Sequence, residues 1–189
     1  MARTLTNIIP LGYKAPAFQL PDTVGGGEKA FQDIKGKHAT VVMFICNHCP
    51  FVVHIQKSMA KLAADYKKQG VGFVAISSND VGNYPQDAPH LMKEFALSNN
   101  FQFPYLYDES QEVAKAYDAA CTPDFSVFDA NESCVYRGEL DGSRPGNEIE
   151  SDGSSIRKVL DLLIEGKEVP SENQKPSIGC NIKWKQDEV

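Results

Sequence analysis

The sequence lacks the features that mark several large classes of protein. Its longest strictly apolar run is the six residues from Val41 to Cys46, far short of the ~20 residues that a bilayer-spanning helix needs. No run of Lys and Arg exceeds two residues, and 19 basic residues face 25 acidic ones, for a net charge of −6. We therefore expect neither a membrane nor a nucleic acid as the main partner.

The sequence also lacks the patterns that are typical of a secretory leader and of a disulfide framework. Residues 1–20 carry only a short apolar patch, Ile8-Ile9, interrupted by Pro10, which does not resemble the apolar core of a signal peptide. The five cysteines are odd in number and sparse for a chain of 189 residues, unlike the dense, even sets of disulfide-rich secreted proteins. We expect a cytoplasmic protein whose cysteines serve chemistry.

Alternating apolar patterns predict an α/β domain. A hairpin is expected within residues 5–35, and the first βαβ unit is formed by a strand over 38–45, a helix over about 47–69 and a strand over 71–77. Such a unit is right-handed and makes the sheet parallel there. Further strands are expected at 103–107, 124–129 and 134–140, the last two as a hairpin, and further helices at about 88–98, 110–119 and 156–164.

The most informative motif is a CxxC at the first strand-to-helix turn, Cys46-Asn47-His48-Cys49. A cysteine at the start of a helix faces unpaired N–H groups and the positive end of the helix dipole, which favour the reactive thiolate. We expect the helix to start at or just after Cys46, whose thiolate would attack. Cys49 would resolve the mixed disulfide, and His48 would supply a nearby cation that makes the disulfide more oxidising.

Two other interpretations use the same residues. Cys46, His48, Cys49 and His54 have the chemistry of ligands for a soft metal such as copper, although no second CxxC completes a tetrahedral set. Alternatively, the two cysteines are inert packing groups. The position of the motif in a βαβ unit favours redox chemistry.

Several motifs resemble those of the AhpC/TSA (redoxin) family, and in particular its peroxiredoxin-like thioredoxin proteins. The resemblance covers roughly residues 8–165 and is carried by Gly12-Tyr13-Lys14-Ala15-Pro16-Ala17-Phe18-Gln19-Leu20, Cys46-Asn47-His48-Cys49-Pro50, Thr122-Pro123-Asp124 and Ser177-Ile178-Gly179-Cys180. It implies a thioredoxin-like fold over residues 1–166, with a central mixed sheet flanked by helices and an N-terminal hairpin. For residues 167–189, the alternation of apolar and other residues from Ile178 to Trp184 predicts an extended tail that docks on the domain.

The resemblance also implies an activity and its partners. A thiol-disulfide oxidoreductase or thiol peroxidase without an organic cofactor would act on protein disulfides or peroxides and take electrons from a thiol reductant. Its cis-proline opposite the CxxC would be Pro123. The peroxidase branch has a PxxxTxxC pattern, whose Pro and Thr are missing before both Cys46 and Cys49. Homo-oligomerisation stays open.

Three residues near these motifs are candidates for auxiliary roles. Thr122 precedes Pro123 in the implied substrate groove. Cys121 lies two residues before Pro123 and is either a third redox partner or a buried small side chain. Cys180 shares an alternating apolar edge with Ile178, Ile182 and Trp184, so it either packs as an apolar residue or resolves a mixed disulfide.

Overall fold

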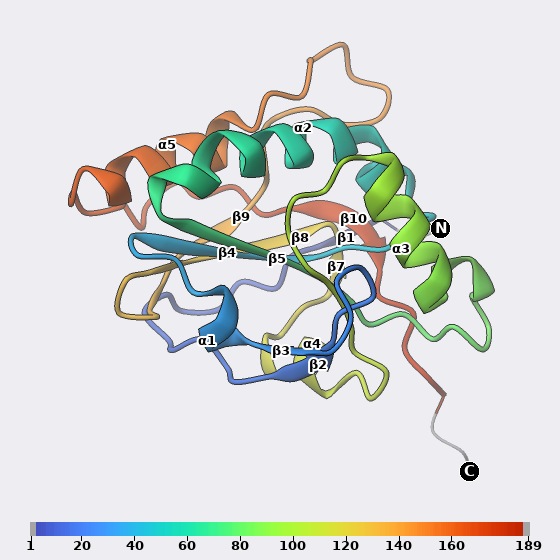
Figure 1. Cartoon of the computed structure of the whole chain (residues 1–189). Helices are drawn as coiled ribbons and strands as arrows, with labels where there is room; N and C mark the ends of the chain where they lie inside the picture. Colours follow the sequence, from blue (N-terminus) through green and yellow to red (C-terminus); the bar gives the residue numbers. More distant parts are fainter. Residues whose placement is uncertain (1–2, 187–189) are drawn as a thin grey trace.

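A computed structural model describes residues 3–186 and shows a central mixed sheet with helices on both faces (Figure 1). The five strands lie in the order β6-β5-β4-β8-β9, with β4 parallel to β5 and antiparallel to β8. All six residues of β4 are buried, as expected for a central strand covered on both faces. The bounds are β4 Ala39–Phe44, β5 Val71–Ser77, β6 Tyr105–Tyr107, β8 Asp124–Asp129 and β9 Cys134–Gly138.

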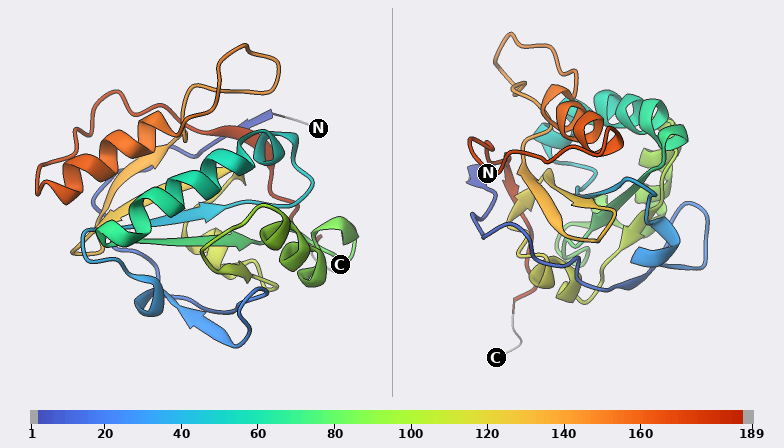
Figure 2. Two further views of the ribbon diagram at one scale, coloured as in Figure 1. Left: turned by 45° about the horizontal axis from the view of Figure 1, so that its top comes forward. Right: turned by 90° about the vertical axis from the view of Figure 1, so that its left-hand side faces the viewer.

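Two helices lie side by side on one face of this sheet, α2 (Pro50–Tyr66) and α5 (Ser154–Ile164) (Figure 2). Helix α3 (Pro89–Ser98) shares their apolar core through Met92 and Ala96. The helix expected over about residues 47–69 buries one apolar stripe, which includes Val52, Ile55, Met59, Leu62 and Tyr66. A 3-10 turn over Lys67–Gln69 follows, and Gly70 in the left-handed region (φ 79°) ends it.

The opposite face is covered by short elements that form a second apolar cluster. These are α1 (Phe31–Ile34), α4 (Glu112–Ala116) and the hairpin of β2 (Gln19–Pro21) with β3 (Glu28–Ala30). The predicted N-terminal hairpin and the hairpin of β8 with β9 are confirmed. Strand β9 ends at Gly138 and α4 spans only residues 112–116, so both are shorter than the patterns predicted.

A second, three-stranded sheet brings the two ends of the chain together. Strand β10 (Ile178–Asn181) lies between β1 (Arg3–Leu5) and β7 (Cys121–Thr122), antiparallel to both. Residues 178–181 of the predicted tail are thereby paired with strands from two other parts of the chain. The expected apolar edge does not extend to Trp184, which is 40% exposed, because the chain leaves the sheet after Ile182 and the main chain of Lys183 binds Asn79 and Asp80 instead.

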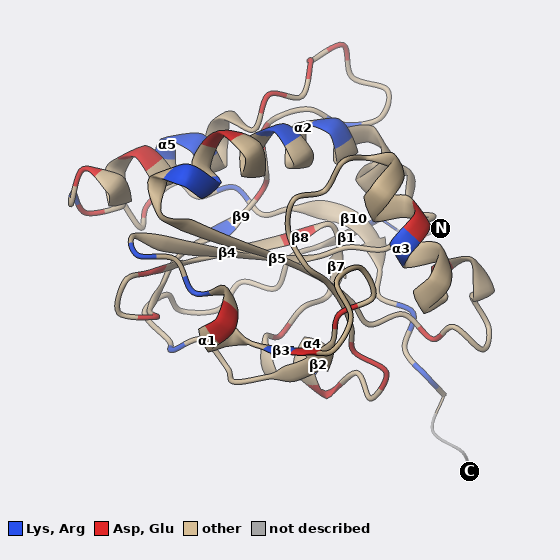
Figure 3. Cartoon of the chain, in the orientation of Figure 1, with Lys and Arg blue, Asp and Glu red and all other residues tan. Residues whose placement is uncertain are grey.

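The charged side chains form no single-sign surface on the two long helices. Basic and acidic residues are interspersed along α2 and α5 (Figure 3). Over the described residues 3–186, every helix is too short or too polar to cross a bilayer.

Candidate active site

The CxxC motif occupies the loop between the end of β4 and the beginning of α2. Helix α2 begins at Pro50, and Cys49 is its N-cap residue, so the predicted helix start at or just after Cys46 is wrong. A residue that precedes proline is driven to extended backbone, and Cys49 has φ −69° and ψ 122°. The Asn47 amide also binds Oδ1 of Asp87 at 2.8 Å, which holds the loop outside the helix.

Three sulfur atoms meet around Thr122. Sγ of Cys46 lies 3.3 Å from the Thr122 hydroxyl, and Sγ of Cys49 lies 3.1 Å from the Thr122 carbonyl oxygen. Sγ of Cys49 is also 2.9 Å from Sγ of Cys180. All three cysteines are buried: the exposed fraction is 1% for Cys46, 0% for Cys49 and 3% for Cys180.

The surroundings of Cys49 favour its thiolate. The pKa of Cys49 is lowered to about 5, chiefly by a hydrogen bond with Cys46 and further by the Cys180 thiol and the Val52 amide, against the opposing effect of burial. Cys49 is the N-cap residue of α2, and the Val52 amide, which lies beside the sulfur, donates to the Cys49 carbonyl oxygen at 3.0 Å. The Thr122 carbonyl oxygen, which can accept a hydrogen bond only from the protonated thiol, opposes the thiolate. The net effect of all these groups is still a lowered pKa.

Cys46 has the opposite character. Its pKa is raised well above that of an ordinary thiol, first by the hydrogen bond with Cys49, then by burial and by the negative charge of Asp87. These pKa directions favour the thiolate on Cys49 over the thiolate expected on Cys46. Cys46 lies before the helix begins.

His48 faces Asp87. Its Nδ1 atom lies 2.7 Å from Oδ2 of Asp87, and its ring stacks on Tyr84 with an interplanar angle of 8°. Burial raises the pKa of Asp87, but the bonds from His48 and Asn79 outweigh it, so the net pKa is lowered. Asp87 directly precedes Ala88, which is the N-cap residue of α3.

Asp87 is therefore a site residue that sequence reasoning missed. It lies beyond the carboxyl end of β5, next to β4 in the sheet, and loops that follow neighbouring parallel strands gather at one edge. That rule could have placed Asp87 near the CxxC loop. No local pattern distinguishes it from a helix cap.

We predict that Asp87→Ala destabilises the protein by about 3 kcal/mol, because buried donors lose a charged acceptor. Asp87 is fully buried and accepts from the Asn47 amide and the Asn79 side chain, each at 2.8 Å. Urea unfolding followed by circular dichroism measures the change. The exposed Glu94 on α3 provides the control, since Glu94→Ala should change stability by less than about 0.5 kcal/mol; equal effects of the two variants would contradict the prediction.

Thr122 and Pro123 form the wall opposite the CxxC. The Thr122–Pro123 peptide bond is cis, as the resemblance implied. Pro123 and Phe51 line one small pocket, which adjoins the first turn of α2. Cys121 points away from the sulfur cluster: its Sγ lies 3.9 Å from the Thr6 hydroxyl and 3.6 Å from the Pro123 carbonyl oxygen, and burial raises its pKa.

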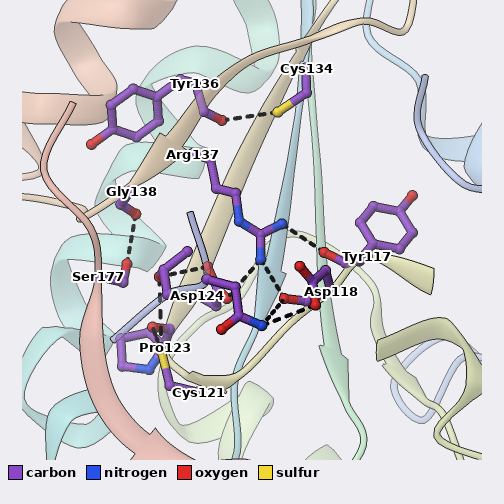
Figure 4. A network of polar contacts seen from close by, with 12 residues as sticks. Tyr117, Asp118, Cys121, Pro123, Asp124, Cys134, Tyr136, Arg137, Gly138 and Ser177 are labelled. Carbon is purple, nitrogen blue, oxygen red and sulfur yellow. Dashed lines mark hydrogen bonds and ion pairs between the residues drawn. The ribbon is translucent and has the colours of Figure 1, made fainter. Parts of the chain in front are cut away.

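A buried ion pair holds the segment that follows Pro123 (Figure 4). The guanidinium of Arg137 lies 3.4 Å from the carboxylate of Asp124 and donates to the carbonyl oxygens of Tyr117 at 2.6 Å and Asp118 at 2.7 Å. The other Asp124 oxygen accepts a 3.0 Å bond from the Thr6 hydroxyl. This network ties strands β8 and β9 to the N-terminal segment behind the sulfur cluster.

The structure assembles a different metal-ligating set from the predicted one. Ligand atoms of Cys46, His48 and Asp87 lie within 4.8 Å of one another. His54 is not among them, because its Nε2 atom lies 2.7 Å from the Ser143 hydroxyl.

Comparison of the sequence with known proteins identifies a family and related proteins. The AhpC/TSA family profile matches residues 11–137. A Mycobacterium tuberculosis protein named "Putative peroxiredoxin" is 30% identical over 116 residues, which cover 61% of this chain and 68% of that protein.

Solved structures of other proteins resemble this structure. The crystal structure of an uncharacterized conserved protein from Geobacillus kaustophilus is 56% identical, with a TM-score of 0.97 over 100% of this chain and 99% of the other. A thiol:disulfide interchange protein DsbE from Chlorobium tepidum aligns with a TM-score of 0.64 at 20% identity, over 83% of this chain and 99% of the other. The second likeness shows the fold alone, and it confirms the predicted thioredoxin fold.

Proposed function

The chain belongs to the AhpC/TSA family of thioredoxin-fold oxidoreductases, and from that premise we propose that Cys46 and Cys49 form its redox-active dithiol. The proposed activity is thiol-disulfide exchange in which the Cys49 sulfur attacks the substrate, and the same Cys49 sulfur reduces peroxides. The observation that carries the proposal is the position of Cys49 at the N-cap of α2, with its pKa lowered to about 5 and the Cys46 thiol as its main hydrogen-bond partner.

The proposal exchanges the two cysteine roles expected from the sequence. The Cys49 thiolate attacks one sulfur of a disulfide substrate, forms a mixed disulfide and releases the other substrate sulfur as a thiolate. Cys46 then loses its proton to that leaving group and attacks the Cys49 sulfur, which releases the second substrate thiolate and leaves a Cys46–Cys49 disulfide. An external thiol reductant restores the dithiol.

The other candidate residues position this pair. Thr122 contacts both sulfurs, through its hydroxyl and its carbonyl, and Pro123 with Phe51 forms the pocket at which a substrate arrives. His48 is placed by Asp87 beside the loop. Because Cys46 and Cys49 are 1% and 0% exposed, small disulfides and peroxides reach the dithiol more readily than folded protein substrates.

Two assays on purified protein test the proposal. Insulin reduction reports on protein disulfides, and peroxide consumption with a dithiol as electron donor reports on peroxides, each for wild type, Cys46→Ser and Cys49→Ser. We expect both variants to lose turnover in at least one assay. Equal rates for wild type and both variants would refute the proposed function.

A second candidate function is binding of a soft metal ion, which is supported by the approach of the Cys46, His48 and Asp87 ligand atoms. Thiolate and imidazole suit Cu(I), although this set is one donor short of a tetrahedral site. Titration with Cu(I) under reducing conditions tests it. Stoichiometric retention that is lost in Cys46→Ser supports metal binding, whereas protein that remains metal-free removes this alternative.

A further inference from the structure

Strand β10 is anchored on both sides of Cys180. Before the strand, the Ser177 hydroxyl donates to the Gly138 carbonyl at 2.6 Å, and the Ser177 carbonyl accepts from the Thr6 amide at 2.9 Å. After the strand, the Lys183 amide donates to the Asn79 side chain at 2.9 Å. The segment that carries Cys180 is therefore held in a fixed place.

A close approach of two backbones brings Cys180 to the dithiol. Cys180 is the register partner of Thr122 in the β10–β7 pair. A Cβ atom on Gly179 would lie 2.0 Å from the Thr122 carbonyl oxygen, so only glycine allows β10 to approach the Thr122–Pro123 segment this closely. The result is the 2.9 Å separation between the sulfurs of Cys180 and Cys49.

Another buried thiol, that of Cys134, lies in a different part of the fold. The Cys134 sulfur lies 3.4 Å from the Tyr136 carbonyl oxygen and belongs to the apolar cluster on the far face of the sheet. Cys180 lies instead in the same cluster as Cys46 and Cys49. Cys49 thus has a thiol neighbour from its own loop and a second one from the C-terminal strand.

We propose that Cys180 is a third redox thiol, and that Cys49 forms two alternative disulfides, one with Cys180 and one with Cys46. The proposal rests on the proposed function, because it takes Cys49 as the sulfur that is oxidised first. It makes Cys180 a residue that touches the reacting sulfur, and it makes the docked tail part of the active site.

The steps balance with hydrogen peroxide as the oxidant. The Cys49 thiolate attacks one oxygen of hydrogen peroxide, the O–O bond breaks, and hydroxide leaves, so that Cys49 becomes a sulfenic acid that carries the attacked O–H group. The pKa of Cys180 is raised to about 12 by burial, so its thiol is protonated. Its sulfur attacks the Cys49 sulfur, and its proton passes to the hydroxyl group that leaves the Cys49 sulfenic acid. Water leaves and the Cys49–Cys180 disulfide forms.

Exchange within the cluster then transfers the disulfide. The Cys46 sulfur attacks the Cys49 sulfur, the Cys49–Cys180 bond breaks, and the proton of Cys46 passes to the departing Cys180 sulfur. No net oxidation occurs in this step. The Cys46–Cys49 disulfide is then reduced by an external dithiol, and Cys180 is ready for another cycle.

Non-reducing peptide mapping tests the proposal on the full chain. One equivalent of hydrogen peroxide is added, the remaining thiols are alkylated in acid, and trypsin then leaves positions 46 and 49 on the peptide 38–57 and position 180 on the peptide 168–183. In Cys46→Ser, the only cysteine of the first peptide is Cys49. We expect these two peptides to be cross-linked in Cys46→Ser, with loss of both thiols, and no cross-link in Cys46→Ser/Cys180→Ser.

Two further variants test whether cross-linking depends on the position of Cys180 or only on the presence of buried thiols. Gly179→Ala, in the Cys46→Ser background, keeps both thiols but displaces β10, and a displacement on the order of 1 Å should slow cross-linking by about 100-fold. Cys46→Ser/Cys134→Ala removes a thiol of the other cluster and should cross-link like Cys46→Ser.

The outcomes distinguish this inference from the proposed function. If wild type forms the Cys46–Cys49 disulfide but Cys46→Ser accumulates Cys49 sulfenic acid while Cys180 remains alkylated, the third-thiol role is wrong and the dithiol activity stands. If peroxide and glutathione disulfide both leave Cys46 and Cys49 fully alkylated in wild type, the proposed function itself fails.

Discussion

Cys49→Ser is expected to lower turnover by at least about 1000-fold, because it removes the sulfur that forms the first bond to substrate. Cys46→Ser should also stop turnover, but it should retain the first chemical step. The difference arises because the serine hydroxyl introduced by Cys46→Ser can replace the Cys46 thiol as the main donor to the Cys49 thiolate, to which the Cys180 thiol and the Val52 amide add. Rapid-mixing measurements with one equivalent of oxidant show the difference as a single turnover in Cys46→Ser and none in Cys49→Ser.

Cys134→Ser is the matched control for these variants. Cys134 is equally buried but lies in the cluster on the other face of the sheet, so its replacement should leave both the first chemical step and the overall turnover unchanged. A single turnover that survives in Cys49→Ser and disappears in Cys46→Ser would restore the roles expected from the sequence and contradict the exchange proposed here.

Asp124→Ala is expected to cost about 3–5 kcal/mol of the free energy of unfolding, because it leaves the Arg137 guanidinium buried without its counter-charge. The side chains of Arg137 and Asp124 are only 4% and 2% exposed. The same substitution removes the acceptor of the Thr6 hydroxyl. Chemical unfolding at neutral pH measures the loss, with Tm as an independent readout.

An exposed ion pair provides the comparison. Lys61 and Asp65 are paired on α2 with their side chains 72% and 36% exposed, and Lys61→Ala should cost no more than about 0.5 kcal/mol. Asp124→Ala and Lys61→Ala with similar effects would show that the buried pair is not a principal support of the segment after Pro123. Replacing both Asp124 and Arg137 by apolar residues should recover part of the loss.

The sequence predicted the framework of the molecule because the relevant signals are local. The continuously apolar β4 and the apolar stripe of α2 are patterns of period and composition, and the structure confirms both. The docking of the tail followed from its alternating residues 178–182. Pro123 was identified by resemblance, since no local pattern reports a cis peptide bond.

The distribution of charge within the site could not be read from the same patterns. Pro50 was taken as a first-turn residue of a helix that begins near Cys46, but proline also restricts the residue before it, which places Cys49 at the cap. The roles of Asp87 and Cys180 depend on contacts across 40 and 131 residues of sequence. Such contacts arise from the topology of the sheet and leave no periodic signal.

The location of the negative charge is tested most directly by pH titration of the ultraviolet absorbance of the thiolate in wild type, Cys46→Ser and Cys49→Ser, with circular dichroism confirming the fold at each pH. We predict an absorbance that is present at neutral pH and falls with a midpoint near 5 in wild type. It should persist in Cys46→Ser, where the serine hydroxyl replaces the thiol donor, and be absent at neutral pH in Cys49→Ser. Thiolate absorbance that rises only near the ~8.5 of an ordinary cysteine, or that is lost with Cys46 and retained without Cys49, would contradict the account.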